Sequence, residues 1–215
     1  MTEMRRLSMG APGSLDLLVI GAHADDIEIG AGATILRLLA EHPGSSILWI
    51  VASSTPVRAA EARASAAAFS AAAASVEVIV GELPDGRLPS VSMAVKDLLE
   101  SVKTRPVDLI LAPHHDDAHQ DHRLMAETVS QTFRRHLVAG YEIPKWDGDL
   151  GRPNLFVDID APTLQRKIDL LQEHFPSQHD QTWWSDDTFR ALPRLRGIEA
   201  ATRYAEGFFC RKVLL

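Results

Sequence analysis

The chain has 215 residues, 46% of them hydrophobic and 24% charged, which suits one globular domain and excludes disordered and collagen-like classes. The formal net charge of −7 disfavours nucleic acid and anionic membranes as partners, because both repel an acidic surface. The chain has a single cysteine, Cys210, and so it cannot form an intramolecular disulfide. No apolar run is long enough for a membrane span, and the first residues do not resemble a secretory signal. We therefore expect a cytoplasmic protein.

The first half of the chain alternates short apolar runs with stretches that have helical patterns. Residues 1–14 are predicted to form a flexible N-terminal tail, and residues 15–215 a single domain. Four strands are predicted, each closed by glycine, proline or polar residues, at 15–20, 47–51, 76–80 and 109–112. Helices are predicted between and after them, at 30–40, 58–74, 91–102 and from about 123.

The second half is less regular. Further strands are predicted at 141–144 and 155–159, and Asp160 is placed to cap a helix that runs to residue 175. Residues 176–187 are polar and are predicted to form a loop. A short helix near 197–205 and a last strand at 208–214 complete the chain.

Four strand–helix units in succession predict a doubly wound α/β sheet with mostly parallel strands and helices on both faces. In such sheets ligands bind beyond the carboxyl ends of the strands, at the point where the strand order reverses. The first and fourth strands are neighbours across that point in the commonest strand order. The fold therefore brings together whatever follows these two strands.

A His-Ala-Asp-Asp cluster follows the first strand. His23 and Asp26 lie three residues apart on one turn, and imidazole and carboxylate are both good zinc ligands. Asp25, between them, would lie beside a metal without binding it, where a carboxylate can act as general base. A glycine pair follows, but Ile35 stands where a dinucleotide-binding loop would have its third glycine.

A second cluster, His-Gln-Asp-His, follows the fourth strand. One of His119 and His122 can complete a His/His/Asp metal set, and the other would face substrate as an acid or oxyanion donor. Asp117 and Asp121 are placed to orient that imidazole. Taken singly, such residues are usually caps, turns or structural histidines, but two clusters at one sheet edge predict a metal site.

Both clusters resemble signatures of the PIG-L/LmbE-like deacetylases. The segment AHADDIEIGAGAT resembles the family's A-H-P-D-D-x-E-x-G-x-G-G-T, and DAHQDH resembles D-x-H-P-D-H. Shorter matches to the family lie at 58–61, 83–86, 174–178 and 204–208. Alanine or glutamine replaces family prolines and one glycine, at Ala24, Ala33 and Gln120. These changes affect backbone rigidity and leave the reactive side chains in place.

The resemblance implies a Rossmann-like fold and one Zn²⁺ per chain, with the ligands His23, Asp26 and His122. It also implies that Asp25 is the general base, and that His119 is the general acid and oxyanion stabiliser, oriented by Asp121. Arg58 and Asp85 would contact substrate. The implied reaction removes an acetyl group from an N-acetylglucosamine-type sugar or its conjugate.

Other functions stay open at this point: an amidase acting on another small-molecule conjugate, a non-catalytic sugar-binding homologue, or a nucleotide-binding protein, which the incomplete glycine motif disfavours. The sequence leaves the native metal and any homo-oligomer undetermined. Aromatic residues that could stack on a sugar are Trp183, Trp184, Tyr141 and Trp146.

Overall fold

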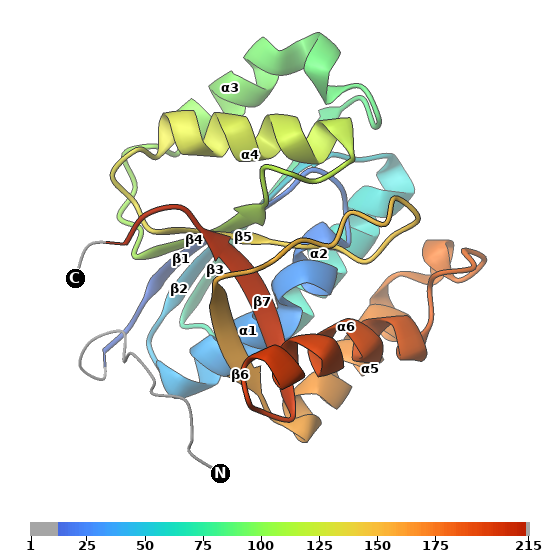
Figure 1. Ribbon diagram of the computed structural model, residues 1–215. Helices are drawn as coiled ribbons and strands as arrows, with labels where there is room; N and C mark the ends of the chain where they lie inside the picture. Colours follow the sequence, from blue (N-terminus) through green and yellow to red (C-terminus); the bar gives the residue numbers. More distant parts are fainter. Residues whose placement is uncertain (1–12, 214–215) are drawn as a thin grey trace.

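One mixed sheet organises the chain. The structure is a computed structural model that describes residues 13–213, and in this part of the chain it contains a seven-stranded sheet of order β3-β2-β1-β4-β5-β7-β6 (Figure 1). The strands are β1 (Asp16–Gly21), β2 (Ser46–Ser53), β3 (Ser75–Leu83), β4 (Leu109–Pro113), β5 (Val138–Tyr141), β6 (Leu155–Ile159) and β7 (Tyr204–Cys210). All pair in parallel except β7, which is antiparallel to both β5 and β6. The predicted fold class is confirmed.

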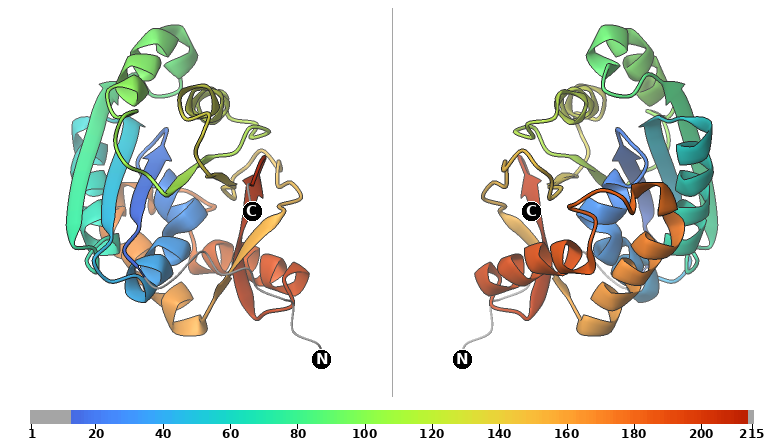
Figure 2. Two further views of the ribbon diagram at one scale, coloured as in Figure 1. Left: turned by 90° about the vertical axis from the view of Figure 1, so that its left-hand side faces the viewer. Right: turned by 90° about the vertical axis from the view of Figure 1, so that its right-hand side faces the viewer.

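Helices cover both faces of this sheet (Figure 1, Figure 2). They are α1 (Asp26–Glu41), α2 (Pro56–Phe69), α3 (Ser92–Glu100), α4 (Gln120–Thr132), α5 (Ala161–His174) and α6 (Asp186–Glu199), with short 3₁₀ turns at Leu88–Val91 and Pro176–Gln178. Alternate residues of β1 enter different cores: Leu17 and Val19 pack toward α1, α2 and α5, whereas Leu18 and Ile20 pack toward α3 and α4. This alternation is the pattern of a strand buried on both faces.

The register of β1 and β4 sets up the functional edge. Leu17, Leu18 and Val19 pair with Leu109, Ile110 and Leu111, so the two strands end side by side and their following loops meet. The predicted adjacency of the first and fourth strands is therefore confirmed. No helix within residues 13–213 is long and apolar enough to cross a membrane.

The later elements differ most from the sequence prediction. The predicted loop at 176–187 and helix at 197–205 are wrong in their boundaries, because α6 spans Asp186–Glu199 and residues 200–203 form a turn. Its buried face carries Arg196, whose guanidinium bonds both carboxylate oxygens of Glu142 at 2.6 and 2.7 Å. A charge on the core side interrupts the apolar periodicity that reveals a helix.

Strand boundaries shift for a related reason. β5 lies at Val138–Tyr141, ahead of the predicted 141–144, and β7 at Tyr204–Cys210, ahead of the predicted 208–214. Parallel pairing with β4, in the register Ile110 with Val138, decides where β5 lies. That pairing is a tertiary constraint that local propensity does not contain. The predicted tail at 1–14 and the end of the last predicted strand fall largely outside the described residues.

The buried ion pair between Lys167 and Glu206 makes hydrogen bonds to backbone groups of α1. Glu206 of β7 accepts the backbone N–H groups of Ala33 and Thr34 at 3.1 and 2.7 Å. Lys167 of α5 donates to Glu206 and to the carbonyl oxygen of Ile29, each at 2.6 Å. A regular helix would bond Ala33 to that carbonyl. The pair therefore links α1, α5 and β7, the elements that support the first cluster.

The predicted cap of α5 is confirmed and allows a test of stability. Asp160 Oδ1 accepts the Thr163 N–H at 2.7 Å, which lowers the pKa of Asp160 from its ordinary value of 3.8. We expect Asp160→Ala to lower the free energy of unfolding by about 1 kcal/mol at neutral pH, and Asp160→Asn to preserve most of it. Because the ionised carboxylate is a stronger acceptor than its neutral form, part of the deficit of the alanine variant should disappear as pH falls through the lowered pKa of Asp160. Urea unfolding at pH 7 and pH 3 measures both effects; a deficit that is equal at both pH values would contradict the cap assignment.

Candidate active site

The loop after β1 places the first cluster through an unusual backbone. Asp25 has φ 102° and ψ −25°, a conformation that non-glycine residues rarely adopt. Asp26 then begins α1, and its Oδ2 accepts the N–H groups of Ala22 and His23 at 2.8 and 2.9 Å. This turn sends the Asp25 and Asp26 carboxylates in different directions. Gly30 follows in α1 because a Cβ there would lie 2.2 Å from the Tyr141 ring.

The second cluster is held at the start of α4. His119 is the N-cap, and its Nδ1 accepts the Asp121 N–H at 3.3 Å. His122, on the first turn, bonds Asp117 Oδ2 through Nδ1 at 2.9 Å. Lys145 in turn pairs with Asp117 Oδ1 at 3.1 Å. In its neutral form, an imidazole whose Nδ1–H is bound by a carboxylate presents an unprotonated Nε2, the tautomer that metal-binding histidines commonly use.

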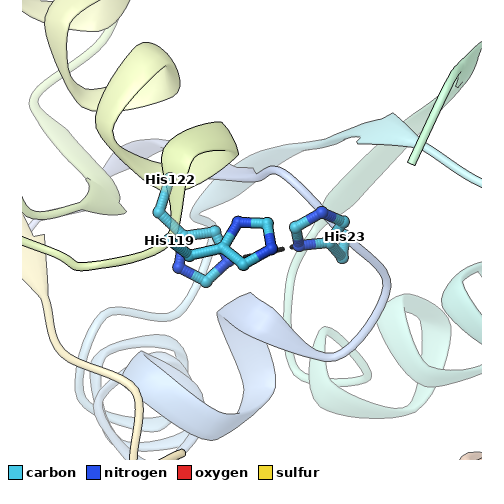
Figure 3. Close-up of side chains that lie close together, drawn as sticks. All are labelled: His23, His119 and His122. Carbon is cyan, nitrogen blue, oxygen red and sulfur yellow. Dashed lines mark hydrogen bonds between the residues drawn. The ribbon is translucent and has the colours of Figure 1, made fainter. Parts of the chain in front are cut away.

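The two clusters converge (Figure 3). His23 Nδ1 lies 3.1 Å from His122 Nε2 and 3.6 Å from Asp26 Oδ2, and His122 Nε2 lies 3.3 Å from Asp26 Oδ1. His119 joins them, since one nitrogen of each of the three histidines lies within 4.8 Å of the others. Imidazole and carboxylate are ligands that a divalent ion such as Zn²⁺ accepts, and the short distances among His23, Asp26 and His122 make these three residues a candidate metal site.

The charges around His23 are also those of a cation site. Burial alone lowers the pKa of this imidazole, but the negative charge of Asp26 and the bonds to Asp121, Asp26 and Asp85 outweigh it and raise the pKa to about 12. His122 behaves in the same way: burial lowers its pKa, and Asp26 and Asp117 raise it to about 9. The surrounding carboxylates thus stabilise positive charge at the point where the imidazoles meet.

Asp25 lies beside this point, held from the other side. Its Oδ2 accepts from Arg58 at 2.6 Å, and Arg58 also bonds Glu61 at 2.7 Å and Ser177 at 3.2 Å. Burial raises the pKa of Asp25 to about 6 against the opposing effect of Arg58. No hydrogen bond among the described residues engages its Oδ1, so that oxygen is free to meet a water molecule. Arg58 therefore holds Asp25 in place.

Asp121 was expected to orient His119, but its carboxylate contacts other groups. Its carboxylate bonds His23 Nε2 at 3.2 Å and the Leu88 N–H at 3.1 Å, and it reaches His119 only through its backbone N–H. Asp85, exposed at the mouth of the site, lies 3.2 Å from the same His23 nitrogen. Burial, together with the charges of His122 and His23, lowers the pKa of His119. The Nδ1 contact and the lowered pKa both favour neutral His119 with its proton on Nε2.

The sequence predicted the groups that meet at this point, but it did not predict all of the residues that support them. Lys145 had no local signal, because its partner Asp117 lies on another loop. Glu61 and Ser177 stood inside matched family segments, and the structure joins them, with the Ser177 Oγ donating to Glu61 at 2.7 Å.

Two of the aromatic candidates are structural. Tyr141 is fully buried and its hydroxyl donates to the Ile20 carbonyl at 2.7 Å. Trp184 is buried against Phe175 and Phe189. Neither ring is therefore available to stack on a sugar, because both fill the core. Trp146 and Trp183 keep exposed surface.

Solved structures share this architecture. The conserved protein TT1542 from Thermus thermophilus superposes with a TM-score of 0.73 at 21% identity, over 94% of this chain and 96% of that one. The N,N'-diacetylchitobiose deacetylase from Pyrococcus horikoshii gives 0.69 at 20% identity, over 92% and 84%. The 4-carboxy-2-hydroxymuconate hydratase GalB from Pseudomonas putida gives 0.69 at 17% identity, over 94% and 98%. At these identities the likeness shows the fold.

The sequence supplies the family. The PIG-L family, described as GlcNAc-PI de-N-acetylase, matches residues 18–133, more than half of the chain and the part that contains both clusters. With the sequence match, the shared fold and the converging clusters in agreement, the chain belongs to the PIG-L family of deacetylases.

Proposed function

We propose that this protein is a metal-dependent hydrolase that removes the acetyl group from an N-acetylated amino sugar or its conjugate. The observation that carries the proposal is the convergence of His23, Asp26 and His122 with a separate carboxylate, Asp25, beside them. Shared fold alone would not decide the reaction, since a hydratase has the same fold. The groups in the site decide the reaction.

The metal that fits this donor set is a divalent ion of the zinc type, held by His23, Asp26 and His122. Such an ion, when bound, polarises the acyl carbonyl and lowers the pKa of water beside it. The acidic residues around His23 and His122 support this assignment, because they offset the charge of a cation.

In this proposal Asp25 transfers a proton and His119 stabilises the negative charge that develops on the carbonyl oxygen. Asp25 accepts a proton from the attacking water through Oδ1, while Arg58 fixes Oδ2 at 2.6 Å. It then returns that proton to the departing amine nitrogen, so that the products are acetate and the free amino sugar. The Nε2–H group of His119 donates a hydrogen bond to the acyl carbonyl oxygen as negative charge develops on that oxygen. The backbone contact at Nδ1 supports this donor role more directly than the general-acid role that the family resemblance implies.

The substrate would lie against the exposed side of the site. The Asp85 side chain is 68% exposed, and its carboxylate can accept a hydrogen bond from a sugar hydroxyl. Arg58 has 18% of its side chain exposed, which leaves an edge for a second hydroxyl. Asp121 contributes indirectly by holding the His23 ring at 3.2 Å.

The proposal is tested by release of free amine from N-acetylglucosamine and from N,N'-diacetylchitobiose. We expect turnover by the metal-loaded protein, loss of turnover after chelation, and recovery when Zn²⁺ is returned. A simple N-acetyl amino acid serves as the comparison for the amidase alternative, and we expect it to react much more slowly. Metal-loaded protein that releases no amine from either sugar would contradict the proposal.

A further inference from the structure

One side chain of the second cluster has no role in the proposed function. It is Gln120, which is exposed and is the first residue of α4. The deacetylase signature that this segment resembles has proline here, and proline suits the first position of a helix because its fixed φ matches the helix and its missing N–H is not needed. A glutamine lacks that rigidity but adds an amide group that can form hydrogen bonds.

The amide of Gln120 bonds the turn that carries Asp85. Its Nε2 donates to the Gly86 carbonyl at 2.5 Å, across 34 residues of sequence. The turn is closed by the bond from the Arg87 N–H to the Pro84 carbonyl at 3.3 Å. Gly86 has a φ of 69° in this turn, which glycine adopts without strain. The contact from Gln120 therefore fixes the turn relative to the start of α4.

A second bond from α4 holds the far end of the same turn. The Leu88 N–H donates to Asp121 Oδ1 at 3.1 Å, and both residues are buried. Asp85 lies between the two anchors, with its Oδ1 3.2 Å from His23 Nε2 although 68% of its side chain is exposed. An exposed contact of this kind contributes little by itself, because water competes for both partners. The position of Asp85 thus depends on how well the turn is fixed.

We propose that Gln120 is a positioning residue, which holds Asp85 at the mouth of the site and thereby strengthens the binding of substrate. The inference rests on the proposed function, in which the Asp85 carboxylate accepts a hydrogen bond from a sugar hydroxyl. A turn that is already ordered loses less conformational freedom when substrate binds. Because Asp85 contacts the sugar and no reacting atom, the effect is expected in KM and not in kcat.

The test replaces Gln120 by proline, which removes the amide and keeps a residue that suits the start of a helix. With N-acetylglucosamine and metal-loaded protein, we expect Gln120→Pro to raise KM about three- to tenfold, the equivalent of one hydrogen bond, and to change kcat less than about twofold. The unfolding midpoint should stay close to that of the wild type. Gln120→Ala should raise KM to the same extent. Gln131→Ala is the matched control, since Gln131 is exposed near the other end of α4 and its replacement should leave KM unchanged.

A double variant shows whether Gln120 acts through Asp85. Asp85→Ala should raise KM by itself, and Gln120→Pro added to it should cause no further rise, because the turn then has no carboxylate to position. A further rise of the same size would mean that Gln120 acts independently of Asp85, and would overturn the proposal. An unchanged KM in Gln120→Pro, or a loss confined to kcat, would overturn it as well.

Hydrogen exchange examines the same contact without turnover. In Gln120→Pro the backbone amides of Arg87 and Leu88 should exchange about three- to tenfold faster than in the wild type, whereas those in the last turn of α4 should be unchanged. If the wild type releases no amine from the sugar, the proposed function fails and this measurement decides the role of Gln120. Faster exchange confined to the turn would support the positioning role, and unchanged exchange would overturn it.

Discussion

Asp25→Asn is expected to lower kcat by about 10²–10⁴-fold, the range that a general base contributes, while the protein keeps its metal. Asparagine has nearly the shape of aspartate and tolerates a positive φ better than most residues, so the backbone at φ 102° is preserved. Arg58 retains Glu61 as a partner at 2.7 Å. The loss should therefore reflect the missing base and not a displaced loop.

The control for this variant is Asp116→Asn, which removes one negative charge from an exposed position on the loop before His119. We expect it to keep wild-type turnover within about twofold, since surface charges of this kind contribute little. Steady-state release of amine, with metal content measured on the same samples, separates the effects. Near-normal turnover by Asp25→Asn would remove the assigned base.

Glu206→Gln is expected to lower the free energy of unfolding by about 3–5 kcal/mol, because it leaves the buried ammonium of Lys167 without a counter-charge. Lys167 and Glu206 have 2% and 3% of their side chains exposed, with 2.6 Å between the charged atoms. The same change weakens the contacts to Ala33 and Thr34 in α1. Equilibrium unfolding in urea measures the loss.

Two further variants complete that experiment. The double variant Lys167→Met/Glu206→Gln should regain part of the stability, since it also removes the unpaired charge. Glu77→Gln breaks the exposed pair with Arg105 and should leave the unfolding midpoint nearly unchanged. A Glu206→Gln protein as stable as the wild type would contradict the account of α1.

Much of the fold could be predicted because strand and helix signals agreed in the first half of the chain. β1 and β4 are apolar runs closed by Gly21 and Pro113, and their adjacency follows from the rules of doubly wound sheets. The bounds of α6 were predicted wrongly because its buried Arg196 finds its partner, Glu142, 54 residues away. Such pairs depend on tertiary structure and leave no local pattern.

The site divides in a similar way. Residue type and spacing predicted that His23 and Asp26 would meet one of His119 and His122, and the family resemblance implied His122. The nitrogen and oxygen atoms of His23, Asp26 and His122 do lie within 3.1–3.6 Å of one another. The partner of the Asp121 carboxylate could not be predicted, since a residue between two histidines can reach either cluster once the chain folds. Contacts from other loops, such as that of Lys145 with Asp117, were equally beyond local sequence.

The central claim is that His23, Asp26 and His122 hold one divalent metal ion, and elemental analysis of metal-loaded protein after exhaustive dialysis tests it most directly. His115→Ala is the matched control, because His115 lies on the same loop and bonds Ser130 at 2.7 Å, away from the cluster. We predict one ion per chain in the wild type and in His115→Ala, and none in His122→Ala. Wild-type protein without metal, or His122→Ala that retains a full ion per chain, would contradict the account.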